Sequence, residues 1–268
     1  MKEQVLHSTD QMGRSVEISF PPRRIVSLVP SQTELLFDLG LDEEICGITR
    51  FCIHPADKVA GKTKIGGTKQ FDIEKIKSLQ PDLIIGNKEE NYLEGITELQ
   101  QHFPVWMSDI FTLQDNAAMM QEVARITNRE KEGAKLIEQI QSGFNQYNPA
   151  SALRGKTASY SIWRKPYMVA ANNTFINHLL GVFGVSNVFG NEERYPEIEP
   201  ELLSHLKPDF IFLSSEPYRF TEKHYEEFQA FCPTSKVLLV DGELFSWYGS
   251  RLKHTPAYFE KLQAELLL

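Results

Sequence analysis

The sequence has few cysteines and no long apolar run. No stretch approaches the roughly 20 apolar residues that a membrane-spanning helix needs. Cys46, Cys52 and Cys232 cannot all pair, so a disulfide framework is excluded as the basis of the fold. The first 20 residues also lack the apolar core of a signal peptide. We therefore expect that a leader has been removed or that the protein stays in the cytoplasm.

Positive charge is also scarce. The chain has 28 Lys and Arg against 36 Asp and Glu, which gives a net charge of −8. An acidic surface repels phosphate backbones, so we expect no nucleic-acid partner. The 268 residues are 41% hydrophobic, which is enough apolar material for a substantial core and for two lobes.

Motifs of catalysis and nucleotide binding are missing as well. Gly61-Lys62-Thr63 resembles the end of a phosphate loop, but Ala56 stands where that motif needs a glycine. Neither H-E-x-x-H nor G-x-S-x-G occurs, and no nucleophile-and-base pattern stands out. These absences favour a binding protein over an enzyme.

Strand and helix patterns alternate along the chain. Residues 25–29 form an apolar run that is typical of a buried parallel strand. Ser31 and Glu34 have the spacing of a capping box for the helix that follows, and Gly40 ends that helix. Before this unit, the polar start predicts a short hairpin that turns at Met12–Gly13.

One segment of the chain is repeated. "IEKIKSLQPDLIIGNKE" matches "PELLSHLKPDFIFLSSE" at a fixed offset of 127 residues, which places Glu74 on Glu201. In the same order, residues 35–41 resemble 179–185, and "VWMSD" resembles "VLLVD". Three matches in one order predict two similar α/β lobes.

A segment without proline lies between the repeats, and Asn128 can cap a helix there that Pro149 ends. We therefore predict an α/β fold of two similar lobes with mainly parallel sheets, joined by one long backbone helix, with the ligand cleft between the lobes. The expected boundaries are 1–127 for the N-terminal lobe with its hairpin, 128–148 for the linking helix and 149–268 for the C-terminal lobe.

Ligands of open parallel sheets bind beyond the carboxyl ends of the strands. The stretch "DGELFSWYGSRLKHTP", residues 241–256, follows the last expected strand and is rich in rings. Aromatic faces and a bidentate guanidinium suit a bulky planar or anionic ligand. The alternative is that Phe245 and Trp247 only pack the edge of the lobe. The candidates at strand ends are Asn87, Glu89, Trp247, Tyr248 and Arg251.

A metal site is a further hypothesis. In "TRFCIHP", Cys52 and His54 are one residue apart, and both side chains bind soft or borderline metals. Glu89, Glu90 or His254 would have to complete the site. The alternative is that Cys52 is a small buried residue and His54 a turn residue.

The segments "PPRRIVSLVPSQTELLFDLGL", "DIEKIKSLQPDLIIGNKEEN" and "PELLSHLKPDFIFL" together resemble the periplasmic-binding-protein class that serves ABC importers of vitamin B12, ferric siderophores and haem. The resemblance implies a monomeric receptor that is not an enzyme and has no covalent cofactor. Its ligand would be a metal complex, cobalamin-like or an iron chelate. Its partner would be an ABC permease of the inner membrane, and its location the periplasm or the cell surface.

The resemblance also implies roles for particular residues. Glu74 and Glu201 match the glutamates with which the family docks onto arginines of the permease. Phe51 is aromatic like its counterpart in B12 binders, whereas Thr68 and Asn87 are not. The expected ligand contacts are Phe51, Trp163, Trp247, Tyr248 and Arg251, with Lys69, Lys88 and Arg164 as further balancing charges.

Two other functions remain open at this point. The missing leader would also fit a cytosolic corrinoid or metal binder. A metal-dependent enzyme would have to be built on Cys52, His54, Glu89 and His254.

Overall fold

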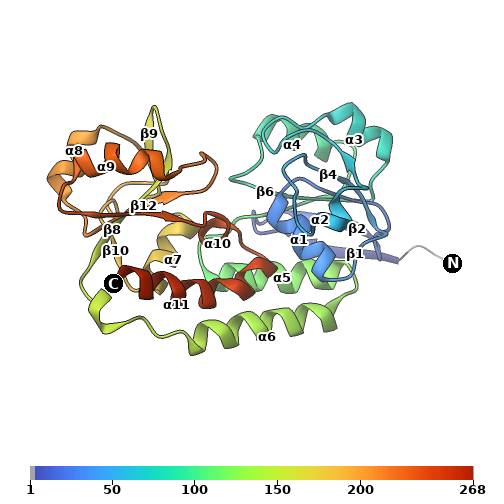
Figure 1. Cartoon of the computed structure of the whole chain (residues 1–268). Coiled ribbons are helices and arrows are strands. Elements are labelled where there is room, and N and C mark those ends of the chain that lie inside the picture. The colour runs from blue at the N-terminus through green and yellow to red at the C-terminus, as the bar shows by residue number, and fades with distance from the viewer. Residues whose placement is uncertain (1–3, 268) are drawn as a thin grey trace. The chain divides into compact units, whose positions relative to one another are not determined.

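The computed structural model describes residues 4–267 and divides into two compact units, shown with their elements in Figure 1. Unit 1 contains the chain up to Ile110, then Gln114–Gln141 and Tyr248–Arg251. Unit 2 contains Phe111–Leu113, Ser142–Trp247 and the chain from Leu252 onward. Each unit has its own mainly parallel sheet, so the predicted α/β class with two lobes is confirmed.

Unit 1 is built on a five-stranded sheet in which every pairing is parallel. The strand order is β5-β4-β3-β6-β7. β3 and β6 are buried along their whole length, as expected for apolar strands that are covered on both faces. The strands are β3 (Ile25–Ser27), β4 (Ile45–Ile48), β5 (Thr63–Lys64), β6 (Leu83–Asn87) and β7 (Val105–Ser108).

Short helices connect these strands. Figure 1 shows α3 and α4 side by side in this unit, and an ion pair between Lys77 and Glu98 joins them. The helices are α1 (Pro30–Asp38), α2 (Ala56–Val59), α3 (Ile73–Leu79), α4 (Leu93–Gln100) and α5 (Leu113–Ile126).

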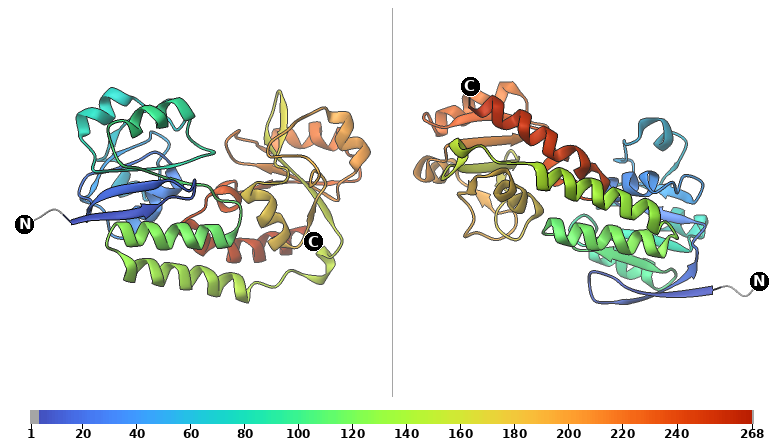
Figure 2. Two further views of the ribbon diagram at one scale, coloured as in Figure 1. Left: turned by 180° about the vertical axis from the view of Figure 1, so that it is seen from behind. Right: turned by 90° about the horizontal axis from the view of Figure 1, so that it is seen from below.

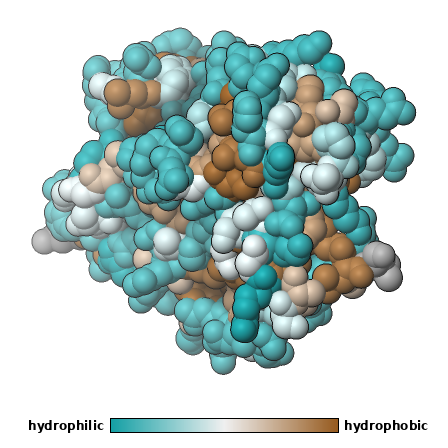
Figure 3. All heavy atoms as spheres, turned by 90° about the vertical axis from the view of Figure 1, so that its left-hand side faces the viewer, coloured by the Kyte–Doolittle hydropathy of each residue, from teal (hydrophilic) through white to brown (hydrophobic). Residues whose placement is uncertain are grey.

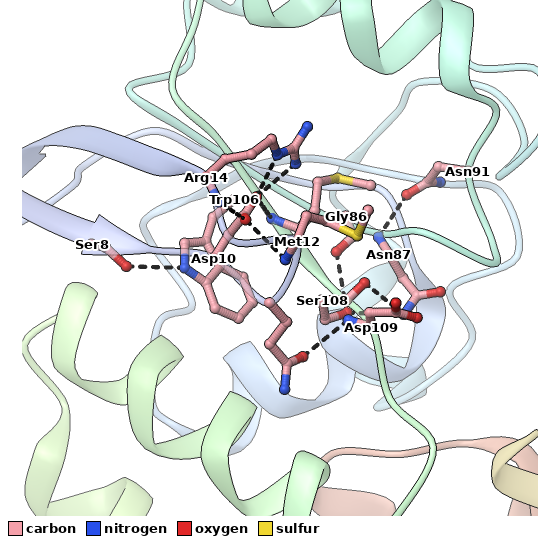
Figure 4. A network of polar contacts seen from close by, with 12 residues as sticks. Ser8, Asp10, Met12, Arg14, Gly86, Asn87, Asn91, Trp106, Ser108 and Asp109 are labelled. Carbon is pink, nitrogen blue, oxygen red and sulfur yellow. Dashed lines mark hydrogen bonds and ion pairs between the residues drawn. The ribbon is translucent and has the colours of Figure 1, made fainter. Parts of the chain in front are cut away.

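The predicted hairpin is present as β1 (Gln4–Thr9) and β2 (Ser15–Phe20), paired antiparallel. Gly13 has the positive φ of 75° that its turn requires. The hairpin lies against β7, because the Trp106 indole N–H donates to Ser8 Oγ at 3.0 Å (Figure 4). The hairpin is therefore part of unit 1.

Unit 2 has the strand order β11-β9-β8-β12-β13, with β10 also paired to β8. Its strands are β8 (Thr157–Trp163), β9 (Tyr167–Val169), β10 (Ser186–Asn187), β11 (Glu197–Ile198), β12 (Phe210–Ser214) and β13 (Lys236–Val240). Its helices are α7 (Phe175–Phe183), α8 (Pro200–Leu206), α9 (Tyr225–Phe231), α10 (Glu243–Ser246) and α11 (Thr255–Leu266). Short 3₁₀ helices lie at Ser151–Leu153 and Glu222–His224, and another, Ser250–His254, begins in unit 1 and ends in unit 2.

Apolar side chains fill the interior of unit 2. One cluster of buried residues includes Val169, Leu213 and Phe228. Figure 3 views the molecule from the side of α8 and α9, where brown apolar surface forms separate patches on a mostly teal face. Within residues 4–267, none of the helices combines the length and apolarity that crossing a membrane would require.

The long helix α6 (Glu130–Gln146) begins in unit 1 and ends in unit 2, as Figure 2 shows from two further sides. The prediction that Asn128 caps it is wrong. Asn128 has a φ of 58° and donates its backbone N–H to Arg125 O, so it ends α5 instead. Asparagine tolerates this left-handed conformation better than most residues do.

The predicted capping box of α1 is not formed either. The helix begins at Pro30, and its N-cap Val29 makes no side-chain hydrogen bond. Proline suits the first turn because its nitrogen has no proton to leave unpaired. Ser31 therefore lies inside the first turn of α1, and the Glu34 carboxylate is used elsewhere.

The sequence repeat is a structural repeat. At the offset of 127 residues, α3 falls on α8 and β6 on β12. Gln80 and Lys207, which end the two helices, have left-handed φ values of 44° and 46°. Asp82 accepts backbone N–H groups from Arg23 and Arg24, and Asp209 accepts one from Thr157. In both units the aspartate thus anchors the segment that leads into a neighbouring strand.

Candidate ligand-binding edges

The five strands of the main sheet of unit 1, β5-β4-β3-β6-β7, are parallel, so their carboxyl ends meet at one edge of that sheet. The segments that leave this edge are 28–32, 49–52, 65–68, 87–91 and 108–110. An open parallel sheet binds its ligands at this kind of edge. We call these segments the unit 1 edge.

Side-chain amides tie the segments of the unit 1 edge together. Asn91 Nδ2 donates to Leu28 O at 3.2 Å and to Thr68 O at 3.1 Å. Asn91 Oδ1 accepts from the backbone N–H of Asn87 at 2.9 Å (Figure 4). Three segments are thereby linked by one buried side chain, so the edge is held in place before any ligand arrives.

Asn87, a predicted ligand contact, has its amide engaged in the same network. Its Oδ1 accepts from the backbone N–H of Glu89 at 2.8 Å and of Glu90 at 3.1 Å. Its Nδ2 donates to Ser108 Oγ at 3.0 Å, and the side chain is only 2% exposed. In this structure Asn87 shapes the 87–91 loop.

Buried polar atoms gather beside Asn87. Gln32 Nε2 donates to Ser108 Oγ at 2.7 Å, while Gln32 Oε1 is buried without a hydrogen-bond partner. Burial raises the pKa of the half-buried Glu90 carboxyl, and the charge of Glu89 raises it further. Glu90 is therefore held in an environment that disfavours its charged form.

Tyr248 lies in unit 1, although Trp247 before it lies in unit 2. The neighbouring Gly249 has a φ of 87° and donates its N–H to Asn116 Oδ1 at 2.6 Å. Burial raises the pKa of Tyr248 well above its ordinary value, and the charge of Glu90 contributes to the rise. The predicted ligand contact Tyr248 is thus buried close to Glu90.

Arg251 is paired within unit 1. Its Nε donates to Glu34 Oε2 at 2.7 Å and its Nη2 to Glu34 Oε1 at 2.9 Å. The two side chains are 13% and 10% exposed. The guanidinium that we expected to meet a ligand is bidentate on a carboxylate of its own unit.

Phe51 is exposed. It follows β4 at the unit 1 edge, and 49% of its surface is accessible. A ring with this much exposure has apolar area left to cover, as the prediction of a ligand contact requires.

Unit 2 has a comparable edge at the carboxyl ends of β8, β12 and β13, which pair in parallel. Trp163, the last residue of β8, is 40% exposed. Its ring meets Tyr218 edge to face with centroids 5.7 Å apart. The Tyr218 hydroxyl in turn lies 3.3 Å from His224 Nε2.

Other predicted residues of unit 2 are engaged inside it. Arg164 Nε lies 2.9 Å from Glu227 Oε2, and the Tyr167 hydroxyl also donates to Glu227. Trp247 is only 9% exposed, and Phe245 is fully buried. The interpretation that Phe245 packs the lobe is confirmed, because its ring contacts Tyr160, Phe183, Phe212, Tyr258 and Phe259.

The metal hypothesis gains no support. The Cys52 thiol is 3% exposed and lies 3.1 Å from Thr33 Oγ1 and 3.2 Å from Thr49 Oγ1. Burial raises the pKa of Cys52, which disfavours the thiolate that metals bind. Residues 4–267 contain no group of three or more His, Cys, Asp or Glu side chains placed to hold a metal ion, and His54 is part of none.

The two predicted docking glutamates are exposed near the start of their helices. Glu74 in α3 has 83% of its side chain accessible, and Glu201 in α8 is exposed as well. Lys77 Nζ lies 3.0 Å from both Glu74 and Glu98. Both glutamates are thus open to a partner.

Sequence reasoning missed two residues of these edges. Tyr218 supports Trp163, and Arg50 precedes Phe51 with its guanidinium carbon 5.0 Å from the centre of that ring. An arginine next to an aromatic residue after a strand was the signal for Arg50. No local pattern marked Tyr218.

Known proteins share this sequence pattern and architecture. A family model described as periplasmic binding protein matches residues 25–234. A vitamin B12-binding protein of Vibrio parahaemolyticus is 26% identical over 201 residues, which cover 72% of this chain and 71% of that protein.

Solved structures agree on the fold. The periplasmic vitamin B12 binding protein of Vibrio cholerae superposes with a TM-score of 0.77 at 22% identity, covering 92% of this chain and 97% of that chain. The periplasmic haem-binding protein BhuT, solved with two haems, gives a TM-score of 0.80 at 18% identity, covering 91% and 99%.

Proposed function

Because this chain belongs to the periplasmic binding protein family, we propose that it is the substrate-binding protein of an ABC importer and that it captures a metal chelate, cobalamin-like or a ferric siderophore or haem. The named relatives are a vitamin B12-binding protein and a haem-binding protein. The two ligands share a broad, largely apolar ring around a metal. A protein that binds either needs aromatic surface in the open.

One observation carries the proposal. Among the described residues, only two of the exposed large apolar side chains are aromatic, Phe51 and Trp163. One belongs to each unit, and each lies at the carboxyl edge of its sheet. Singly exposed apolar side chains are common on protein surfaces, so the argument rests on the position of these two rings: strand ends are where open sheets bind ligands.

The proposed ligand contacts are Phe51, Asn87, Glu89, Tyr248 and Arg251 in unit 1, and Trp163 and Trp247 in unit 2. In this arrangement Arg251, Asn87 and Tyr248 act mainly by holding the unit 1 edge. The proposal includes no covalent cofactor and no metal ion coordinated by side chains of the protein. The protein is proposed to act as a monomer outside the inner membrane.

Ligand binding is tested by tryptophan fluorescence. The native protein is titrated with cyanocobalamin, dicyanocobinamide, haem and several ferric siderophores, and quenching with saturation is expected for at least one. Covering half of a ring removes about 100 Å² from water, worth about 2.5 kcal/mol. Leucine keeps part of this apolar contact, so Phe51→Leu and Trp163→Leu should each lose about 1.4 kcal/mol, which weakens binding about tenfold. Phe51→Leu leaves all three tryptophans in place for the readout, and Trp163→Leu is followed by absorbance of the ligand.

Leu93→Ala is the matched control for these variants. Leu93 is 73% exposed on α4 and lies outside the segments of the edge, so its removal takes away apolar surface without touching the proposed site. If no probe binds, or if Leu93→Ala weakens binding as much as Phe51→Leu does, the proposal is wrong.

Delivery to the permease is proposed to use Glu74 and Glu201. Both are exposed, so Glu74→Ala and Glu201→Ala should leave folding unchanged while lowering the ATPase activity that the loaded receptor stimulates in the reconstituted importer. Glu94→Ala, another exposed glutamate near a helix start, is the control. If the variant that carries both Glu74→Ala and Glu201→Ala stimulates the ATPase activity as much as the native protein does, the docking role is wrong.

A further inference from the structure

Arg50 is a cation at the unit 1 edge that differs from the others in its partners. Three other cations of unit 1 that were expected to balance the ligand are engaged: Arg251 with Glu34, Lys88 with Asp109, and Lys69 with the backbone carbonyl of Glu89. In unit 2, Arg164 is paired with Glu227. Arg50 is exposed, and within residues 4–267 no carboxylate pairs with its guanidinium. Its charge is therefore available to a ligand.

The position of the Arg50 side chain is defined. Its guanidinium carbon lies 5.0 Å from the centre of the Phe51 ring, a cation–π distance. The Arg50 backbone N–H donates to Gly66 O at 2.8 Å, which joins the segments after β4 and β5. The guanidinium thus lies over an exposed ring at the carboxyl edge of the sheet.

Gly67 completes this arrangement. A methyl group added at Gly67 would come within 3.2 Å of Phe51 Cε2 and 3.6 Å of Arg50 Nη2. Gly67 is buried, so the ring and the guanidinium close over its backbone. A methyl group at this position would require the Phe51 ring to shift by a few tenths of an ångström and would be in van der Waals contact with the guanidinium, so both groups pack against the Gly67 backbone.

We infer that Arg50 and Phe51 form one subsite, in which the ring contacts the macrocycle of the ligand and the guanidinium binds an anionic group attached to it. This inference rests on the proposed function and narrows its ligand to a chelate that carries a carboxylate or phosphate beside a flat apolar surface. Arginine suits that group because its planar fork binds both oxygens, and its own stacking on the ring reduces the freedom lost on binding.

The test compares ligands with and without the anionic group. Haem carries two propionates and haem dimethyl ester carries none; cyanocobalamin carries a phosphodiester that dicyanocobinamide lacks. For whichever pair binds, Arg50→Gln should weaken the anionic member about tenfold or more, since a charge-assisted bidentate contact is lost. The uncharged member should change less than twofold.

Arg154→Gln is the matched control. Arg154 is exposed, and replacing it with glutamine changes the net charge by the same amount as Arg50→Gln does. It lies just before β8, whereas Trp163 is the last residue of that strand. It should leave both affinities unchanged. Raising the salt concentration should weaken binding of the anionic probe to the native protein and have less effect on Arg50→Gln, because the screened charge pair is then absent.

Three results separate the inference from the proposal beneath it. Equal loss of the charged and uncharged probes in Arg50→Gln, or no loss of either, would overturn the Arg50 subsite and leave the receptor function intact. Equal loss in Arg154→Gln would also overturn the subsite, because the effect would then be one of overall charge. Absence of any binding by the native protein would overturn the receptor function and the subsite together.

Discussion

Arg251 and Glu34 are 217 positions apart in the chain and form a bidentate ion pair, with Arg251 Nε and Nη2 each donating to one oxygen of the Glu34 carboxylate. The pair ties the returning segment Tyr248–Arg251 to helix α1 within unit 1. Gly249 ties the same segment to α5, since its N–H donates to Asn116 Oδ1. The segment is thus an integral part of unit 1.

Breaking this pair should destabilise the protein. With both side chains about nine-tenths buried, removal of one partner leaves an uncompensated charge, and we expect Arg251→Met or Glu34→Gln to cost about 3 kcal/mol. Urea unfolding measures the loss. The double variant should cost less than the sum of the two single variants, because it removes both charges. Additive losses would show that the two side chains are not coupled.

Gly86 should not tolerate a side chain. A methyl group there would come within 2.7 Å of Asn91 Oδ1 and 2.8 Å of Met107 Sδ. We expect Gly86→Ala to destabilise the protein by about 1 to 3 kcal/mol and to weaken ligand binding, because Asn91 links three segments of the unit 1 edge. Thermal unfolding and the fluorescence titration report the two effects.

Gly181→Ala provides the comparison for Gly86→Ala. Gly181 lies in α7 with open space around it, so alanine should stabilise the helix by about 0.5 to 1 kcal/mol. If Gly86→Ala raises the unfolding midpoint as Gly181→Ala does, packing around Gly86 is not as tight as the distances indicate.

The sequence was sufficient for the architecture because the architecture is repeated. Two segments that match at one offset and share an apolar pattern predict the same helix and strand in the same order in each lobe. The structure has this helix and strand as α3 and β6 in unit 1 and as α8 and β12 in unit 2. Strand ends could also be located, since a parallel strand reads as a short apolar run. The rule for open sheets then gave strand-end candidates such as Asn87 and Glu89, whereas Phe51 and Trp163 were expected from the resemblance to the family.

The contacts made by individual side chains could not be predicted in the same way. Glu34 has the spacing of a capping box, and nothing local reveals that Arg251 lies beside it. Whether Trp247 is buried or exposed depends likewise on packing among residues distant in sequence. The ligand roles of Arg251 and Trp247 stay predictions, whereas the capping role of Glu34 is excluded by the start of α1 at Pro30.

The repeated aspartates should contribute alike to both units. Asp82 accepts from two backbone N–H groups at 2.7 and 2.8 Å, and Asp209 accepts from the backbone N–H of Thr157 at 2.9 Å. We expect Asp82→Ala and Asp209→Ala each to cost about 1 to 2 kcal/mol in urea unfolding, because charged acceptors of backbone donors are lost. Asp57→Ala, at an exposed position of α2, should change stability by less than about 0.5 kcal/mol.

Glu90 and Glu122 should respond to pH with opposite signs. Burial and the charge of Glu89 raise the pKa of Glu90 above the ordinary 4.5, so its ionisation costs stability, and the cost appears as the pH rises above 4.5. For Glu122, burial alone would raise the pKa, but hydrogen bonds from Arg125 and Ser8 outweigh it and lower the pKa below 4.5. The stability that Glu122 provides is therefore present above pH 4.5 and lost as the pH falls below that value.

The same substitution should therefore act in opposite directions at the two sites. At pH 7, Glu90→Gln should raise the urea midpoint, because the disfavoured charge is removed, and Glu122→Gln should lower it, because the hydrogen-bonded charge is lost. Both differences in urea midpoint should shrink as unfolding is repeated at successively lower pH. The difference between Glu90→Gln and the native protein should vanish below about pH 4, where Glu90 is protonated in both the folded and the unfolded state. The difference between Glu122→Gln and the native protein should fall as Glu122 itself becomes protonated in the folded protein. If Glu90→Gln lowers the urea midpoint at pH 7, the surroundings stabilise the Glu90 carboxylate. The conclusion that this part of the unit 1 edge disfavours the charged form of Glu90 would then be wrong.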